Sequence, residues 1–300
     1  MSGILFICVA CLVWAVDTLI RYPLLGKGYS AGQIILFEHL FLTTLFIPSV
    51  FRLLKKLLTS DKKILFSFFM IGGVGSALST LAFTKAFTVL NPSLVILLQK
   101  LQPVVAITLS GIFLKEKIDS KFIFWSAICI IAGLGVSYQQ IFGGLSINKF
   151  SDIFKGNTPY LGVILSLFAV IGWGSATVFG KYLQSNQFKT NEIMSGRFFF
   201  GLLTSLYLLL GPKPILTNLN QLFFKDILLL VLLSGVIGMF FYYRGLKRLP
   251  AKVATLAELF FPICAVIVNW LYLNSTLDWI QIISAVVLVF GSTIIQIRRY

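Results

Sequence analysis

AFTVLNPSLVILLQKLQP, from Ala86 to Pro103, returns in altered form as GLKRLPAKVATLAELFFP, from Gly245 to Pro262. Leu90 matches Leu249, and Pro103 matches Pro262, because 249 − 90 and 262 − 103 both equal 159. The same shift aligns further residues: Trp14 with Trp173, Glu38 with Arg197, Ser76 with Gly235, Ser79 with Gly238, Lys85 with Arg244 and Gln99 with Glu258. A constant offset of this kind predicts a duplicated unit.

The composition indicates a membrane protein. Of the 300 residues, 58% are hydrophobic and only 12% are charged, whereas soluble domains carry roughly 25% charged residues. A soluble chain this apolar would have too few charged side chains to cover its surface. The net charge of +15 is therefore assigned to basic cytoplasmic loops, and no nucleic-acid partner is expected.

The four cysteines, Cys8, Cys11, Cys129 and Cys264, all fall inside apolar runs. Cys8 and Cys11 form a CxxC pair, but there is no second pair and His39 is the only histidine. Packing is therefore favoured over a metal site, and no cofactor is expected. The first residues carry no positively charged segment, so no removed signal peptide is expected.

Apolar runs long enough to cross a bilayer, which needs about 20 residues, recur along the whole chain. They predict an all-α membrane protein with ten transmembrane helices, at 3–21, 32–51, 64–87, 93–114, 121–138, 160–181, 192–210, 226–246, 252–273 and 278–297. The segment 139–159 links the two halves. The predicted repeats are residues 1–145 and 158–300, with five helices each.

Lysine and arginine residues indicate the orientation. They gather at 52–63, 115–121 and 247–252, on the side of the N-terminus, while Arg21 and Lys27 are placed on the opposite side. The positive-inside rule then puts both termini in the cytoplasm, for a multi-pass protein of the inner (cytoplasmic) membrane. Because five helices per half is an odd number, the second repeat must be inverted, which is typical of transporters.

Several motifs resemble the drug/metabolite transporter superfamily in its EamA-like branch. LNPSLVILLQKLQP is followed by Glu116, and the second copy, RLPAKVATLAELFFP, departs from the pattern with Asn274-Ser275-Thr276. The Trp-Gly-Ser of Trp173 to Ser175 also fits. The resemblance implies two inverted five-helix repeats, in which helices one to four surround a central cavity and the fifth lies outside. It also implies transport of small molecules.

Ionisable residues inside apolar spans are candidates for the functional site, because a charge at the bilayer centre costs at least ~2.5 kcal/mol. They are Asp17, Glu38, His39, Lys85, Lys100, Arg197, Arg244 and Glu258. The first five are placed in the outer half of the membrane or near its middle, and the last three in the inner half. Lys85 and Arg244 lie near helix ends, where snorkelling towards water is the alternative.

Helical periodicity groups these residues with others on shared faces. Trp14, Asp17 and Arg21 form one stripe, in which a local Asp17–Arg21 ion pair is the alternative to a substrate role. The remaining predicted faces are Gln99 with Gln102 and Pro103, Thr255 with Glu258 and Pro262, and Trp173 with Thr177. Lys100 is expected about a quarter turn away from Gln99. Pro103 and Pro262 are candidate hinges, with a static kink as the alternative.

Glu38 is the first candidate for a proton-coupling residue, because an apolar surrounding disfavours the charged form of a carboxyl group. A structural ion pair with Lys85 or Lys100 is the alternative. For His39, a hydrogen-bonded packing role is favoured over a role as ligand.

These residues together predict a substrate that is zwitterionic or partly anionic, such as an amino acid or a related metabolite. The predicted function is alternating-access transport, with proton-coupled export as its detailed form. Uptake or exchange, for example of nucleotide-linked or methyl-donor compounds, an uncoupled channel and a lipid-translocating protein stay open as alternatives. The expected partners are the substrate, membrane lipids and protons, and the chain is either a monomer or a homodimer. No enzyme is expected, since only Asp17 could serve a two-aspartate protease and no HExxH motif occurs.

Overall fold

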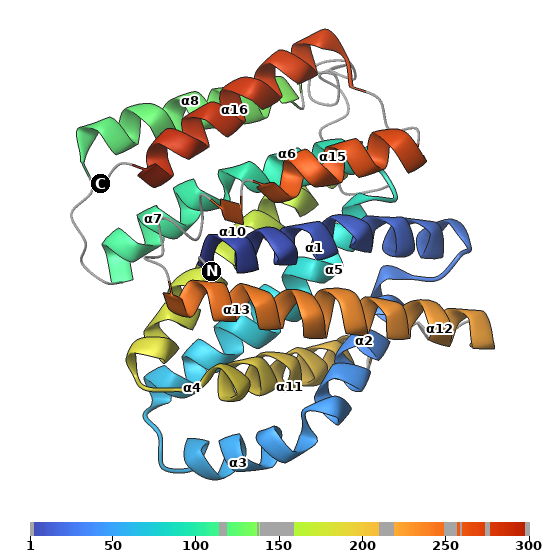
Figure 1. The fold of residues 1–300 in the computed structure, drawn as a ribbon, viewed down its shortest axis with the longest axis vertical. Helices are drawn as coiled ribbons and strands as arrows, with labels where there is room; N and C mark the ends of the chain where they lie inside the picture. The colour runs from blue at the N-terminus through green and yellow to red at the C-terminus, as the bar shows by residue number, and fades with distance from the viewer. Residues whose placement is uncertain are drawn as a thin grey trace, which may run out of the picture.

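The computed structural model describes residues 3–113, 119–136, 138, 159–209, 219–248, 257–258, 260–273 and 277–297, and every element in these ranges is helical (Figure 1). The first half contains α1 (Gly3–Gly26), α2 (Ala31–Leu45), α3 (Ile47–Leu57), α4 (Lys62–Phe69), η1 (Met70–Leu78), α5 (Ser79–Ala86), α6 (Pro92–Leu98), η2 (Gln99–Leu101), α7 (Gln102–Phe113) and α8 (Ser120–Val136). The second half contains α10 (Pro159–Ser185), α11 (Thr190–Leu209), α12 (Gln221–Leu230), η4 (Val231–Gly238), α13 (Met239–Arg248), α15 (Phe260–Leu273) and α16 (Trp279–Ile297). Some residues singled out in the sequence lie outside the described ranges. They are the predicted link except for its last residue, Pro159, together with Glu116, Thr255, Asn274 to Thr276 and the side chain of Pro262.

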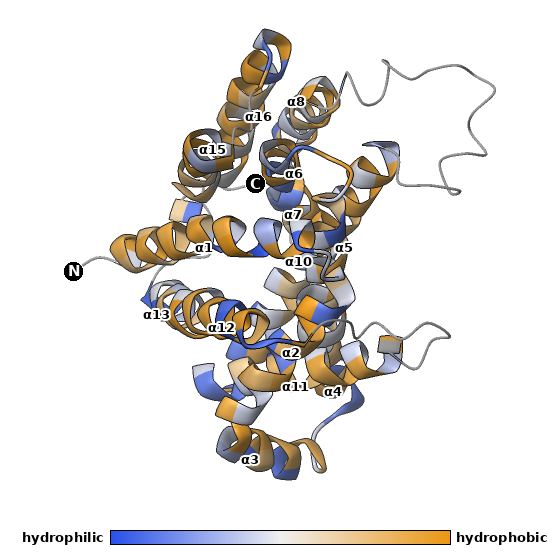
Figure 2. Cartoon of the chain, turned by 90° about the vertical axis from the view of Figure 1, so that its right-hand side faces the viewer, coloured by the Kyte–Doolittle hydropathy of each residue, from blue (hydrophilic) through white to orange (hydrophobic). Residues whose placement is uncertain are grey.

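Several of these helices are long and apolar enough to cross a membrane. The described residues contain five such runs: Gly3–Gly26, Lys62–Ala86, Pro92–Phe113, Pro159–Ser185 and Gln221–Gly245. The bent pair of α2 and α3 would make a sixth. Helices at the outside of the bundle, such as α15 and α16, are also rich in hydrophobic residues, drawn in orange in Figure 2. On α16, Trp279, Ile283 and Val286 are exposed, as expected for side chains that face lipid.

The structure corrects two predicted spans. The run predicted at 32–51 is not one helix, because it breaks at Phe46, and α2 and α3 meet at 84°. Pro48, in the first turn of α3, accounts for the break, because proline lacks the N–H that would continue the helix from α2. The first helix, predicted to end at Arg21, continues to Gly26 and brings Arg21 inside the protein.

Irregular helical turns occur inside three of the long runs. η1 and η4 are π-helices, which interrupt α4–α5 and α12–α13. η2 is a 3₁₀ turn directly before Pro103, where the missing proline N–H leaves the Gln99 carbonyl without its usual partner. The backbone N–H of Gln102 donates to that carbonyl instead. Such irregular turns are frequent at functional sites.

The helices pack in a pattern that repeats between the two halves. α1 packs against η4, α13 and α15, while α10 packs against η1, α5 and α7. The 159-residue shift relates these two sets of contacts, so the first helix of each half contacts elements of the opposite half. α8 and α16 pack against each other at one edge of the bundle (Figure 1).

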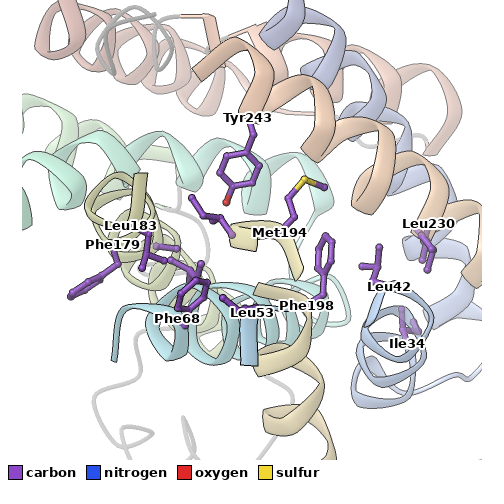
Figure 3. Close-up of a cluster of buried hydrophobic side chains, with 14 of the residues drawn as sticks. Ile34, Leu42, Leu53, Phe68, Phe179, Leu183, Met194, Phe198, Leu230 and Tyr243 are labelled. Carbon is purple, nitrogen blue, oxygen red and sulfur yellow. The ribbon is translucent and has the colours of Figure 1, made fainter. Parts of the chain in front are cut away.

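Buried apolar side chains join the halves. One cluster contains Leu42 and Phe68 from the first half with Phe198, Leu230 and Tyr243 from the second (Figure 3). A second cluster lies around α6 and includes residues of α8, α10 and α16. Close packing is a main source of helix association inside a bilayer, where lipid is as apolar as the side chains. The two halves therefore share one interior.

Candidate functional site

A polar cavity of about 230 Å³ lies between the two halves. Its described walls come from α1, α2, η1, α5, η2 and α7 of the first half and from α10, α11, η4 and α13 of the second, with Glu258 and Phe261. None of its described lining residues belongs to α8 or α16. The cavity is therefore built by both halves and excludes the helix pair at the edge.

Most of the predicted site residues line this cavity. They are Trp14, Asp17, Glu38, His39, Gln99, Lys100, Gln102, Trp173, Arg197 and Glu258. Lys100, expected a quarter turn away from Gln99, reaches the cavity together with it. Both residues belong to the 3₁₀ turn η2.

Two further candidates, Lys85 and Arg244, are not among the described residues that line this cavity. Both side chains are exposed. The Arg244 guanidinium lies over the rings of Phe6 and Phe240, 5.3 and 5.5 Å from their centroids. Both basic residues lie near helix ends, where long side chains can reach polar surroundings.

A buried ion-pair cluster is centred on Arg21, which is 3% exposed. Its Nε and Nη2 donate to Asp17 at 2.7 and 2.9 Å, and its Nη1 donates to Glu38 Oε2 at 3.1 Å. Arg21 also donates to Thr84 Oγ1, and the Ser234 hydroxyl donates to Asp17. The cluster thus connects α1, α2, α5 and η4.

This cluster changes two sequence-based interpretations. The Asp17–Arg21 ion pair, considered as an alternative, is present. Glu38 pairs with Arg21, and not with Lys85 or Lys100, which were the partners considered in the alternative to its coupling role. The sequence had placed Arg21 at the end of the first predicted helix, and its position in the stripe with Trp14 and Asp17 was a usable signal for the cavity.

His39 is 2% exposed, and both of its ring nitrogens have partners. Nδ1 lies 2.8 Å from the Ile35 carbonyl and Nε2 lies 3.0 Å from Ser76 Oγ. Since a carbonyl only accepts, Nδ1 carries a proton, and in the neutral ring Nε2 accepts from the Ser76 hydroxyl. Gly201 faces the ring at a distance that leaves no room for a Cβ atom. These contacts agree with a hydrogen-bonded packing role for His39.

Arg197 and Glu258 differ from the Arg21 cluster because part of their hydrogen-bonding capacity is unused. Arg197 Nη2 donates to the Gly75 carbonyl at 3.5 Å, but its buried Nε has no partner among the described residues. The buried Oε1 of Glu258 also has none there. Lys100 Nζ lies 3.5 Å from the backbone carbonyl of Glu258. Two residues of the cavity lining thus each keep one polar atom without a partner among the described residues.

Two aromatic pairs line the cavity. Trp14 packs against Tyr242 with ring centroids 5.4 Å apart, and Phe83 packs against Trp173 at 5.1 Å. The indole N–H of Trp14 donates to the Ser234 carbonyl in η4 at 3.2 Å. Sequence analysis missed Phe83 and Tyr242, although the 159-residue shift relates them to each other.

Metal-binding and redox features are limited. No group of three or more His, Cys, Asp or Glu residues that could hold a metal ion occurs within the described ranges. Cys8 and Cys11 are free thiols, and the buried Cys11 Sγ lies 3.8 Å from the Ala257 carbonyl. The described chemistry of the cavity is therefore that of charges, amides and aromatic rings.

Comparison with known proteins agrees with this arrangement. The chain matches the EamA-like transporter family over residues 1–139 and 160–297. It is 30% identical, over 309 aligned positions, to the riboflavin transporter ImpX of Fusobacterium nucleatum subsp. nucleatum, with 99% of this chain and 98% of that protein covered. A crystal structure of another protein shares the fold with a TM-score of 0.59 at 13% identity, over 98% of this chain and 96% of that one.

Proposed function

Because the chain belongs to the EamA-like transporter family, we propose that it moves a small polar metabolite across the membrane by alternating access. The observation that carries the proposal is the polar cavity between the two halves. Ionisable groups inside a membrane protein are costly and are usually kept for substrates or coupling ions. A cavity between related halves is also where transporters of this kind bind their substrates.

The proposed architecture is ten transmembrane helices in two inverted five-helix repeats, residues 1–145 and 158–300. Two recurring features support it. The shift of 159 residues carries η1 onto 229–237, which overlaps η4 (Val231–Gly238). The same shift relates Trp14 to Trp173 and Phe83 to Tyr242, so the Trp14–Tyr242 pair corresponds to the Trp173–Phe83 pair. We further propose that the protein lies in the cytoplasmic membrane with both termini in the cytoplasm, as the basic loops suggest.

Riboflavin is the first substrate to test. The support comes from the name of the relative and from the aromatic pairs, which suit a planar heteroaromatic ring. An amino acid is the second candidate. It is favoured by the opposite charges of Arg197 and Glu258, which could hold a carboxylate and an ammonium group.

We assign proton coupling to Glu258 and no longer to Glu38. Arg21 donates to both oxygens of the Glu38 carboxylate through two guanidinium nitrogens, so this carboxylate already has a protein partner. Glu258 keeps one buried oxygen without a partner among the described residues. A proton and a donor group of the substrate would compete for this carboxylate. Such competition is what export in exchange for protons requires, whereas uptake would need both to bind together.

The decisive experiment is counterflow of labelled riboflavin in vesicles that contain the purified protein. Excess unlabelled riboflavin inside should drive transient accumulation of the label, which an open channel cannot produce. Imposing a pH gradient should then drive net riboflavin movement against its own gradient. Arg197→Leu should insert normally but lose this flux, and Arg244→Leu is the matched control outside the cavity. Absent counterflow with both riboflavin and amino acids would contradict the proposal.

A further inference from the structure

Resting on the proposed function, we infer that the substrate carries no net charge and is held between Arg197 and Glu258. Arg197 donates to an acceptor of the substrate, and Glu258 accepts from a donor of the same molecule. The inference extends the proposed function in two ways. It names the two residues that orient the substrate, and it states the net charge of the substrate that the cavity prefers. It also excludes the partly anionic substrate considered from the sequence.

The formal charges of the described cavity walls cancel. The basic lining residues are Arg21, Lys100 and Arg197, and the acidic ones are Asp17, Glu38 and Glu258. The Arg21 cluster combines one cation with two carboxylates, while Lys100, Arg197 and Glu258 combine two cations with one carboxylate. A neutral substrate leaves this balance intact. A phosphate ester would bring negative charge into a cavity of low dielectric, where uncompensated charge is strongly disfavoured.

The unused hydrogen-bonding atoms identify the two contacts. Arg197 Nε and Glu258 Oε1 are buried without partners among the described residues, and such groups are costly unless a ligand or water satisfies them. No ion pair within 4.0 Å joins these two residues in the described part of the chain. Both residues line the same cavity. A molecule between them needs one acceptor and one donor at separate positions.

The aromatic pairs indicate that the substrate contains a planar ring. Tyr242, which lines the cavity with both charged residues, belongs to the Trp14 pair, and the second pair is Phe83 with Trp173. Aromatic rings of this kind favour offset or edge contacts with another planar ring. The chemistry that fits is a neutral heteroaromatic compound with carbonyl acceptors and N–H or O–H donors. Riboflavin meets this description, whereas its 5′-phosphate meets it in all respects except charge.

The experiment compares equilibrium binding of riboflavin and riboflavin 5′-phosphate to the purified full-length protein, by flavin fluorescence. The wild-type protein should prefer riboflavin by about tenfold or more. Glu258→Gln, which leaves the walls net positive, should reduce that preference. Arg197→Gln, which leaves them net negative, should increase it. The matched controls are Glu192→Gln and Arg244→Gln, which lie outside the lining and should keep the wild-type ratio.

The ratio of the two dissociation constants is measured on one sample, so it does not depend on how much of a variant has folded. Equal wild-type affinities, or ratios that stay unchanged in both cavity variants, would overturn the inference. Riboflavin counterflow would then still support the proposed function. If no flavin binds, glutamine and glutamate replace the pair. A preference for glutamine over glutamate that falls in Glu258→Gln and rises in Arg197→Gln would support the inference for a substrate other than a flavin. Equal affinities for glutamine and glutamate would overturn it.

Discussion

Trp14 packs against Tyr242 with the two ring centroids 5.4 Å apart, and this contact joins the first helix of one half to the third helical run of the other. The 159-residue shift converts it into the contact between Trp173 and Phe83, at 5.1 Å. Each half thus supplies a tryptophan to the opposite half. Neither half could form the walls of the cavity alone, which explains why the polar residues of both halves meet there.

Replacing Arg21 with Met should destabilise the protein by about 3–5 kcal/mol, because Asp17 and Glu38 would remain buried without their shared partner. Thermal unfolding in detergent would measure the loss. Arg244→Met, at an exposed cation, should change stability by no more than about 0.5 kcal/mol. The triple variant Arg21→Met, Asp17→Asn, Glu38→Gln should recover part of the loss. A single variant as stable as wild type would show that the cluster does not hold these helices together.

The tryptophans of the two aromatic pairs should contribute to substrate affinity. Trp14→Ala and Trp173→Ala should each weaken flavin binding by about tenfold, a loss near the upper end of about 0.5–1.5 kcal/mol for an aromatic contact. Trp14→Phe should retain more affinity than Trp14→Ala. Trp279, which is 79% exposed on α16, provides the control, since its replacement by Ala should leave binding unchanged. Equal losses at Trp279 would point to a general packing effect.

Gly201→Ala should destabilise the protein by about 1–3 kcal/mol, as expected for overpacking. The added methyl group would collide with the His39 ring and disturb its hydrogen bond with Ser76. His39→Ala should relieve the collision, so the double variant should lose less than the sum of the two single losses. Additive losses, measured by thermal unfolding, would rule out this contact between α2 and α11.

Glu258→Gln should retain riboflavin counterflow but lose net transport driven by a pH gradient, since glutamine can accept a hydrogen bond and cannot carry the coupled proton. The Glu38→Gln variant loses one member of the Arg21 cluster and should yield less folded protein. The fraction that does fold should still respond to the pH gradient. Flux in vesicles with and without the gradient separates the two carboxyl groups. The opposite outcome, with the response lost only in Glu38→Gln, would return the coupling role to Glu38.

Much of the helical framework could be predicted from the sequence because each helix reflects a continuous apolar run. The exceptions arose where one residue changed the local backbone. Pro48 divided the predicted second helix, and a 3₁₀ turn precedes Pro103. Most of the charged residues that line the cavity had been selected by asking which ionisable groups lie inside apolar runs. That criterion missed Arg21, since it lies at the predicted end of such a run.

The sequence by itself determined that the chain is a helical membrane protein, that its halves are related by a shift of 159 residues, and which polar residues lie within apolar segments. Composition and helical periodicity are local properties, and they suffice for these conclusions. Only the tertiary structure decided that Glu38 pairs with Arg21 and that His39 is satisfied by Ile35 and Ser76. It also decided that Arg197 and Glu258, which line one cavity, each keep a polar atom without a partner among the described residues. Those contacts join helices that are distant in the chain, and they depend on how whole helices pack against one another.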